Sequence, residues 1–429
     1  MAGTPRATAW QAGMVTEPRA TLEGRALVAA TAALLLGVFA VGSEALVISP
    51  LLEDIAGDFG TGVDAAGLSV SVYGLAVAVV APTAGWVADR VSRRGAILWG
   101  LVVFAVAGAL CAAAPSLLSL VAGRALCGVG AGLFLPAAYA WVGDEVPYES
   151  RARVMGWVIA GWALALVAGV PAGGLIGEVA GWREALAALA ALAAAATVLA
   201  AHLLPVGSGA ARSDVGGARV GLRRALAVPA VRWLLAVNLL DMLAFYGVYT
   251  YLGSFLRDEL DVRSGVAGAL ILAYGAGVAL MSMNGGLIDR VGKARTATLT
   301  LAALTVIYAG LPWVAGALIL LVLVLAVMGT QQAGFLTAMA TLATNAMPEG
   351  RGAVVALMSC TTYIGVTLGA AAMGPVFSGP GYEAIGGVCA AIAAVAAVLS
   401  LRLRAGDVPA SLAAAPAVPG PGTPPPGRR

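Results

Sequence analysis

Three ionisable side chains stand inside long apolar stretches of this chain. Glu44 lies in GVFAVGSEALVISP, Arg124 in LVAGRALCGVG and Asp241 in LAVNLLDMLAF. A charged side chain at the centre of a bilayer costs roughly 2.5–3.5 kcal/mol on insertion scales, so such residues are rare and mark functional sites. A carboxyl group in such a place can bind and release a proton.

Glu44 and Arg124 are expected to lie at the same depth. Counted from the ends of their predicted helices at 1.5 Å per residue, both stand roughly 10–12 Å below the same surface. An arginine beside a carboxylate favours the charged form, so we expect Arg124 to set the proton affinity of Glu44. The alternative is a static ion pair that holds two helices together.

Asp241, with Asn238 one turn before it, is the second candidate for proton coupling, and a gate residue that faces the cytosol is the alternative. Polar and aromatic side chains near the middle of the predicted helices are expected to line a cavity for a small, largely apolar molecule. Each of them is equally compatible with plain packing. These candidate substrate-binding residues are Asn238, Tyr246, Tyr249, Tyr274, Gln331, Gln332 and Tyr363.

The elements that must position these residues are membrane helices. The 429 residues are 60% hydrophobic and only 11% charged, with a mean hydropathy of +0.93, which excludes an ordinary soluble domain. A bilayer core needs about 20 apolar residues per helix, and the continuous apolar runs exclude a membrane β-barrel. The predicted spans are 26–51, 67–88, 95–114, 116–142, 154–178, 184–204, 231–256, 264–288, 296–312, 315–345, 352–377 and 383–402.

The basic residues predict the orientation, because Lys and Arg concentrate in cytoplasmic loops. Only Arg183, Arg257 and Arg263 fall in predicted outer loops, so both termini are expected in the cytoplasm of a bacterial cell with the protein in its inner membrane. The net charge of +3 then reflects this topology and indicates no nucleic-acid partner. The predicted units are a tail (1–25), a six-helix bundle (26–204), a linker (205–230), a second six-helix bundle (231–402) and a disordered tail (403–429).

The two predicted bundles repeat one sequence plan. AGWVADRVSRRG at 84–95 has a partner in NGGLIDRVGKAR at 284–295, so that Asp89 and Asp289 are 200 residues apart. PYESRARVMGW at 147–157 corresponds in the same way to PEGRGAVVALM at 348–358. Parallel repeats of this kind are typical of transporters that rock around a central site.

These motifs resemble those of the major facilitator superfamily, and most of all its twelve-span drug:proton antiporters, over roughly residues 26–402. Gly85, Asp89, Arg90, Arg93 and Arg94 match the signature of the loop after the second span, with Ser92 in place of the usual glycine. Arg124 and Gly128 match the fourth-span signature, and GWALALVAGVPAGGLIG resembles the fifth-span motif of exporters, with GVPAGG as a departure from the common form. This variant, SEALVISPLLEDIAGDFG and YTYLGSFL resemble arabinose-efflux-like exporters.

Two further groups of residues are interpreted as machinery. The charged connections are expected to form a conformational latch, a set of ion pairs that is closed in one conformation and open in the other. Simple anchoring by positive charges is the alternative. The latch candidates are Gly85, Asp89, Arg90, Arg93, Asp144, Asp289 and Arg290. Small residues four apart in the fifth span let another helix approach closely, and a proline among them should bend the helix. These helix-packing candidates are Gly169, Pro171, Gly173 and Gly177.

The sequence therefore predicts a proton-coupled exporter of a small amphipathic compound, such as an antibiotic. A dedicated exporter of sugars or nucleobases is the main alternative, followed by an uptake symporter and a membrane sensor. No catalytic triad, phosphate loop or metal-ligand spacing is visible, so we expect neither an enzyme nor a cofactor or metal. Protons, one small-molecule substrate and the lipid bilayer are the expected partners of a monomer.

Overall fold

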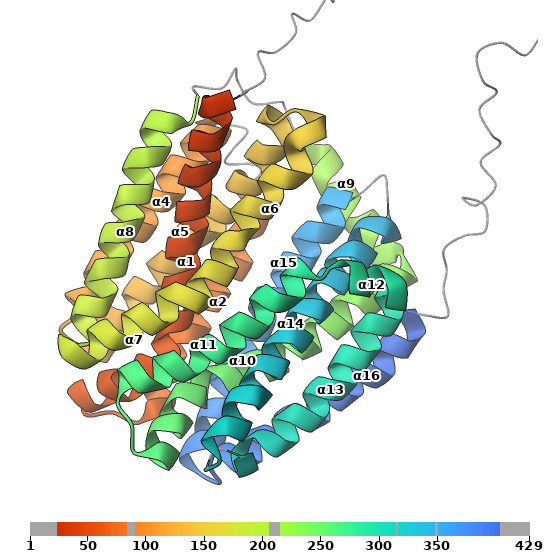
Figure 1. Ribbon diagram of the computed structural model, residues 1–429. Helices are drawn as coiled ribbons and strands as arrows, with labels where there is room; N and C mark the ends of the chain where they lie inside the picture. Colours follow the sequence, from red (N-terminus) through yellow and green to blue (C-terminus); the bar gives the residue numbers. More distant parts are fainter. Residues whose placement is uncertain (1–23, 84–90, 206–214, 315, 348–350, 404–429) are drawn as a thin grey trace, which may run out of the picture.

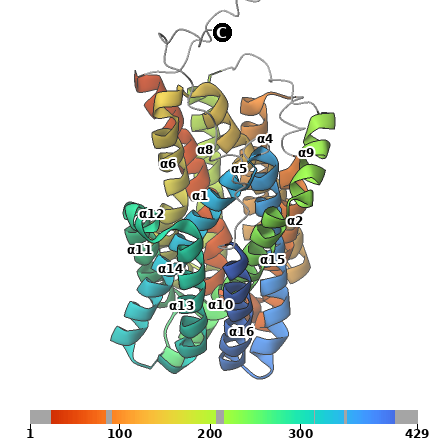
Figure 2. The same ribbon diagram turned by 90° about the vertical axis from the view of Figure 1, so that its right-hand side faces the viewer.

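The computed structural model describes residues 24–83, 91–205, 215–314, 316–347 and 351–403. Twelve of the helices in these ranges are long and apolar enough to cross a membrane, and they form two bundles of six (Figures 1 and 2). The predicted all-α fold is thereby confirmed. Apart from short 3₁₀ turns at Ala81–Thr83 and Leu401–Leu403, the helices are α1 (Gly24–Asp58), α2 (Val63–Val80), α4 (Arg93–Ala112), α5 (Leu117–Glu145), α6 (Tyr148–Leu164), η2 (Ala165–Gly169), α7 (Val170–Val179), α8 (Trp182–Leu203), α9 (Val215–Ala227), α10 (Pro229–Leu260), α11 (Ser264–Met283), α12 (Gly286–Val291), α13 (Lys293–Val314), α14 (Leu318–Ala346), α15 (Arg351–Ser378) and α16 (Tyr382–Ser400).

Helices α1 to α8 form the N-terminal bundle and α10 to α16 the C-terminal bundle. We call the end of the molecule where α1 begins the tail end, and the end where α1 turns into α2 the loop end. The most extensive contacts between the bundles are those of α2 with α15, α7 with α11, and α1 with α10. In the described residues, the ion pairs that join the two bundles all lie at the loop end.

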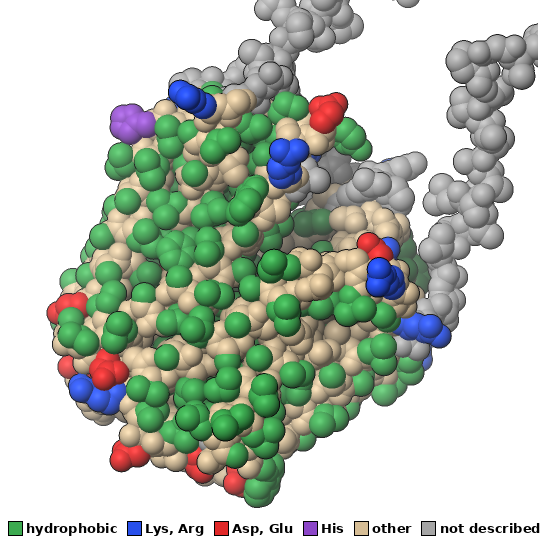
Figure 3. All heavy atoms as spheres, in the orientation of Figure 1, with side chains coloured by type: hydrophobic (Ala, Val, Ile, Leu, Met, Phe, Trp, Pro, Cys, Tyr) green, Lys and Arg blue, Asp and Glu red, His purple; other side chains and the backbone are tan. Residues whose placement is uncertain are grey.

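The surface is hollowed between the two bundles toward the tail end, as the space-filling view in Figure 3 shows. The loop end is closed by contrast, since α7 meets α11 there (Figure 1). A chain whose halves touch at one end and part at the other has the shape of one state of a rocking pair of bundles.

Helices α1 and α2 extend into the predicted loop between them. Helix α1 continues to Asp58 and α2 starts at Val63, so most of the predicted outer loop after the first span is helical. The predicted linker at 205–230 contains helix α9, whose moderately amphipathic sequence was too polar to be read as a span. Residues 206–214 of that linker, and both predicted tails apart from Gly24, Arg25 and Leu403, lie outside the described residues.

Ser92 adopts a backbone conformation that favours glycine. Its φ is +84°, close to the +90° of Gly292, the residue 200 positions later. Ser92 is therefore strained, yet its Oγ accepts a hydrogen bond of 3.1 Å from the amide of Gly95 and caps the start of α4. The replacement of glycine by serine noticed in the sequence thus keeps the same turn and adds a cap.

Candidate functional site

Glu44 of α1 and Arg124 of α5 form a buried ion pair in which Arg124 Nη1 donates to Glu44 Oε1. Gly128 lies one turn further along α5, where a Cβ atom would stand only 2.4 Å from the carbonyl oxygen of Tyr73. This glycine lets α5 approach α2 closely, so that Arg124 lies 4.6 Å from the centre of the Tyr73 ring and donates from Nε to the Ser69 carbonyl at 3.4 Å. The structure brings Glu44 and Arg124 together as their predicted depths require.

The hydrogen bonding of this ion pair is incomplete. Glu44 and Arg124 are 1% and 0% exposed, and Glu44 Oε2 and Arg124 Nη2 have no partner among the described residues. The hydroxyls of Ser69 and Tyr73 are equally without one. A buried ion pair with unused donors and acceptors contributes little to stability. A stabilising role therefore does not explain the presence of this pair.

Asp241 of α10 lies in the C-terminal bundle and is completely buried. Gln332 of α14 donates from Nε2 to its Oδ2 at 2.8 Å. Asn238, one turn earlier on α10, donates from Nδ2 to the hydroxyls of Thr361 and Thr362 on α15, both at 3.0 Å. The structure therefore gathers three predicted site residues where α10, α14 and α15 meet.

Three of the predicted tyrosines form an aromatic cluster around Phe245 of α10, which the sequence reading missed. The ring of Phe245 stacks on those of Tyr249 and Tyr274, with centroids 5.4 and 5.7 Å apart, and meets Tyr246 edge-on at 5.1 Å. The signal that could have found Phe245 is its place one turn after Asp241. Tyr363 lies on α15, and its backbone carbonyl would stand 3.1 Å from a Cβ atom at Gly74 of α2.

Gln331 occupies a different place from its neighbour Gln332. It lines a groove of about 410 Å³ formed by α11, α12, α13 and α14, together with Asn284 and Thr330. Adjacent residues of a helix point about 100° apart, so Gln331 and Gln332 leave α14 in different directions. A role of Gln331 in substrate binding stays a prediction.

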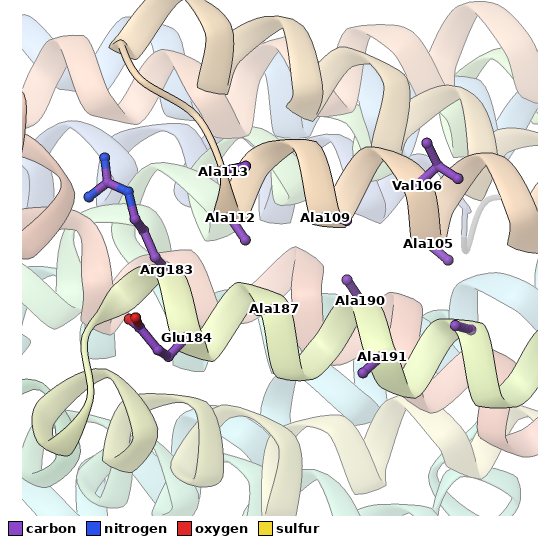
Figure 4. A pocket seen from close by; sticks show the side chains of 11 residues that line it. Ala105, Val106, Ala109, Ala112, Ala113, Arg183, Glu184, Ala187, Ala190 and Ala191 are labelled. Carbon is purple, nitrogen blue, oxygen red and sulfur yellow. The ribbon is translucent and has the colours of Figure 1, made fainter.

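A larger groove lies between α4 and α8, shown in Figure 4, and has a volume of about 660 Å³. Alanines dominate its walls, and its charged residues are Arg183 and Glu184 at one end. Val106 on the same surface is 55% exposed, as expected of a surface that faces lipid. This groove contains none of the predicted site residues.

The predicted glycine face of the fifth span packs against α1. A Cβ atom at Gly173 or Gly177 would stand 2.3 Å from the side chains of Val47 and Leu51, and one at Gly169 would clash with Ser43. The predicted bend takes the form of a π-helical turn at Ala165–Gly169. Pro171 follows this turn directly and has no N–H to continue the regular ladder, which explains the irregularity.

The latch residues are only partly described. Gly85, Asp89 and Arg90 lie outside the described residues, while two other candidates lie together, with Arg93 Nε 3.0 Å from Asp144 Oδ2.

In the repeat, Asp289 of α12 pairs at 2.9 Å with Lys293, the first residue of α13. Arg290 is exposed. A latching role for either group stays a prediction.

The sequence reading also missed an ion cluster at the loop end, which we call the loop-end clamp. Arg257 of α10 donates to both carboxylate oxygens of Asp54 at 2.7 and 2.8 Å and to the Pro50 carbonyl at 3.2 Å. Its Nε also lies 3.0 Å from Glu53 Oε2, close but not aligned for a hydrogen bond. In the sequence, the only indication of this clamp was the presence of Glu53 and Asp54 in the first predicted outer loop and of Arg257 in the fourth.

Comparison with known proteins decides the family. The family model described as Major Facilitator Superfamily matches residues 34–349. The chain belongs to the major facilitator superfamily. It is therefore a multi-pass membrane transporter and not an enzyme, with a small-molecule substrate and the lipid bilayer as its surroundings.

Relatives of this transporter extend the comparison. An uncharacterized MFS-type transporter of Bacillus subtilis, YwfA, is 38% identical over 374 residues, which are 86% of this chain and 90% of the relative. A chloramphenicol resistance protein of Streptomyces lividans is 29% identical over 60% of this chain and 66% of its own length. The crystal structure of a bacterial homologue of the human lysosomal transporter Spinster, inward-facing and unoccupied, shares the fold with a TM-score of 0.67 at 16% identity, covering 90% of this chain and 96% of that one.

Proposed function

We propose that this transporter exports a small amphipathic compound, such as an antibiotic, in exchange for protons. The observation that carries the proposal is the buried ion pair of Glu44 and Arg124, which joins two helices of the N-terminal bundle with unused hydrogen-bonding atoms on both partners. An ion pair of this kind is expensive to bury and is retained for use.

The proposed mechanism is a change of partner at Glu44. Arg124 is the partner of the carboxylate in the state described above, and a proton takes the place of the arginine when the helices shift and this contact is lost. Rocking of the bundles would expose this group first to one side of the membrane and then to the other. A proton taken up outside is then released inside, and the substrate travels the other way.

Export rather than uptake is supported by two observations. The fifth-span motif, here the glycine face against α1, resembles that of exporters. A relative 37% identical over 34% of this chain and 30% of its own length is named a probable multidrug-efflux transporter, Rv1634 of Mycobacterium tuberculosis, and the Streptomyces relative is named for chloramphenicol resistance. We infer further that the tail end faces the cytoplasm, because most Lys and Arg residues within the described ranges belong to helix ends on that side.

The test compares the wild type with Glu44→Gln in a bacterial strain without its own efflux pumps. Tolerance to one or a few compounds, present in the wild type and absent in the variant, is the expected result. Everted membrane vesicles then measure coupling directly, since the substrate should collapse a pre-formed pH gradient only in the wild type. Glu184→Gln makes the same chemical change at an exposed position and should leave both readouts unchanged.

Two results would contradict the proposal. Substrate-induced proton flux of equal size in Glu44→Gln and wild type would remove Glu44 from coupling. Growth protection against none of a broad panel of antibiotics and cationic dyes, with the protein present in the membrane, would favour a dedicated exporter of sugars or nucleobases.

A further inference from the structure

Three buried acceptor atoms of the polar cluster in the C-terminal bundle receive no hydrogen bond from the described residues. Asp241 Oδ1, Asn238 Oδ1 and Gln332 Oε1 have no hydrogen-bond partner within the described part of the chain. All three side chains are at most 1% exposed. A buried acceptor without a donor costs about 1–3 kcal/mol, so three in one cluster indicate a ligand that supplies hydrogens.

The amide orientations follow from their own donors. Gln332 Nε2 faces the Asp241 carboxylate at 2.8 Å, and Asn238 Nδ2 faces the carbonyl of Met358 at 3.3 Å. A carboxylate and a carbonyl can only accept, so neither amide can be reversed without loss of a bond. The amide oxygens of Asn238 and Gln332 therefore keep the positions in which no donor of the described residues reaches them. Asn238 and Asp241 share one face of α10 because they are three residues apart.

The cluster also has a negative charge to satisfy. Among the described residues, no Lys or Arg forms an ion pair with Asp241, whereas Arg124 neutralises Glu44. Carboxylate and amide oxygens together bind a positively charged group. The two polar sites of the transporter thus differ: Glu44 is paired with an arginine, and Asp241 has no cationic side chain as an ion-pair partner among the described residues.

Aromatic rings lie next to this cluster on α10. Phe245 stands one turn from Asp241, and its ring stacks with Tyr249 and Tyr274. Such ring faces attract an ammonium group and pack against an apolar body. The surroundings therefore match a protonated amine attached to an apolar or aromatic skeleton.

We propose that Asn238, Asp241 and Gln332, which we call the acceptor cluster, bind a protonated primary or secondary amine of the transported compound. The inference rests on the proposed function, since it names the substrate class of that exporter. Its distinctive consequence is selectivity for N–H groups. A quaternary ammonium of the same size and charge cannot donate to the three oxygens and should bind more weakly.

The experiment uses the purified full-length transporter in detergent and two fluorescent probes, a dansyl alkylamine and its N,N,N-trimethyl analogue. Both carry one positive charge at pH 7. Fluorescence anisotropy should give a dissociation constant about tenfold lower for the primary amine in the wild type, because hydrogen bonds to the charged group are lost in the analogue.

Variants locate the selectivity. Gln332→Met and Asn238→Leu should bring the ratio of the two dissociation constants toward one, and Asp241→Asn should weaken both probes. Thr330→Val, on the neighbouring groove face of α14, should leave the ratio unchanged. Gel filtration and thermal unfolding show whether each variant is folded. The ratio of the two dissociation constants in the wild type tests the proposal even if a variant does not fold.

The outcomes separate this inference from the proposed function. Equal affinities of the two probes in the wild type would overturn the acceptor cluster as an amine site, even if Glu44-dependent proton flux is present. The binding of the primary amine probe is also measured in buffer with choline chloride in place of sodium chloride. If binding is lost without sodium, the three oxygens hold a sodium ion and not the amine, and the proposal is overturned. A tenfold preference for the primary amine, in protein that shows no substrate-induced proton flux, would support the amine site and contradict the proposed proton coupling.

Discussion

Arg257→Gln should open the loop end of the transporter. The loop-end clamp joins α1 of one bundle to α10 of the other through Arg257, Asp54 and Glu53. An outward-open state must separate these two helices, so the clamp stabilises only the state in which the loop end is closed. Its removal shifts the equilibrium toward the opposite state without touching Glu44 or Asp241.

The size of the shift follows from the geometry. Arg257 and Asp54 are 15% and 30% exposed, so water screens part of the attraction. An exposed ion pair contributes about 0.2–1 kcal/mol, and a bidentate, charge-assisted pair is roughly twice as strong as a neutral one. With the Glu53 and Pro50 contacts added, we expect about 2 kcal/mol, which corresponds to a change of about 30-fold in the ratio of the two states.

Spin-label distances measure this ratio. Cysteines at Gly57 and Ser378 would carry the labels, since both positions are exposed at the loop end of different bundles and Gly57 has open space around it. The four native cysteines are first replaced. Double electron–electron resonance should show a longer-distance population in Arg257→Gln that is minor in the parent.

Arg183→Gln is the matched control. Arg183 pairs with Asp58 at the same end, but both belong to the N-terminal bundle. Its loss should leave the distance distribution unchanged. An equal shift in both variants, or no shift in Arg257→Gln, would refute the reasoning that the clamp separates the two states.

Three further predictions concern stability, and thermal unfolding in detergent checks each of them. Arg124→Leu should destabilise the protein by about 3–5 kcal/mol because Glu44 is left buried without its partner, whereas the double variant Glu44→Leu, Arg124→Leu should recover most of the loss; an unchanged single variant would show that water reaches the pair. Gly177→Val should lower the melting temperature, since even a Cβ atom would stand 2.3 Å from Leu51, and an unchanged melting temperature would mean that α7 can move away from α1. Ser92→Gly should stabilise by about 1 kcal/mol, because relief of the positive φ outweighs a cap loss of a few tenths; a lower melting temperature would show that the cap dominates.

Hydropathy alone determined the fold class of this protein and the number of its spans. Continuous apolar runs must be helical in a bilayer, where every backbone group needs an internal partner, and the repeat at a spacing of 200 residues predicted two similar bundles. The depth count also predicted that Glu44 and Arg124 could meet, since rise per residue is constant along a helix. Spacing by four predicted the packing face that Gly173 and Gly177 present to α1.

Contacts between distant helices were decided only by the tertiary structure. The cluster of Asn238, Asp241 and Gln332 depends on how α14 and α15 rotate against α10, and a list of polar residues contains no such rotation. The loop-end clamp joins residues about 200 positions apart in the chain, and its acids were indistinguishable in the sequence from solvated loop residues. Sequence periodicity specifies which face of a helix is polar, but only the packing of the helices decides which neighbouring helix that face contacts.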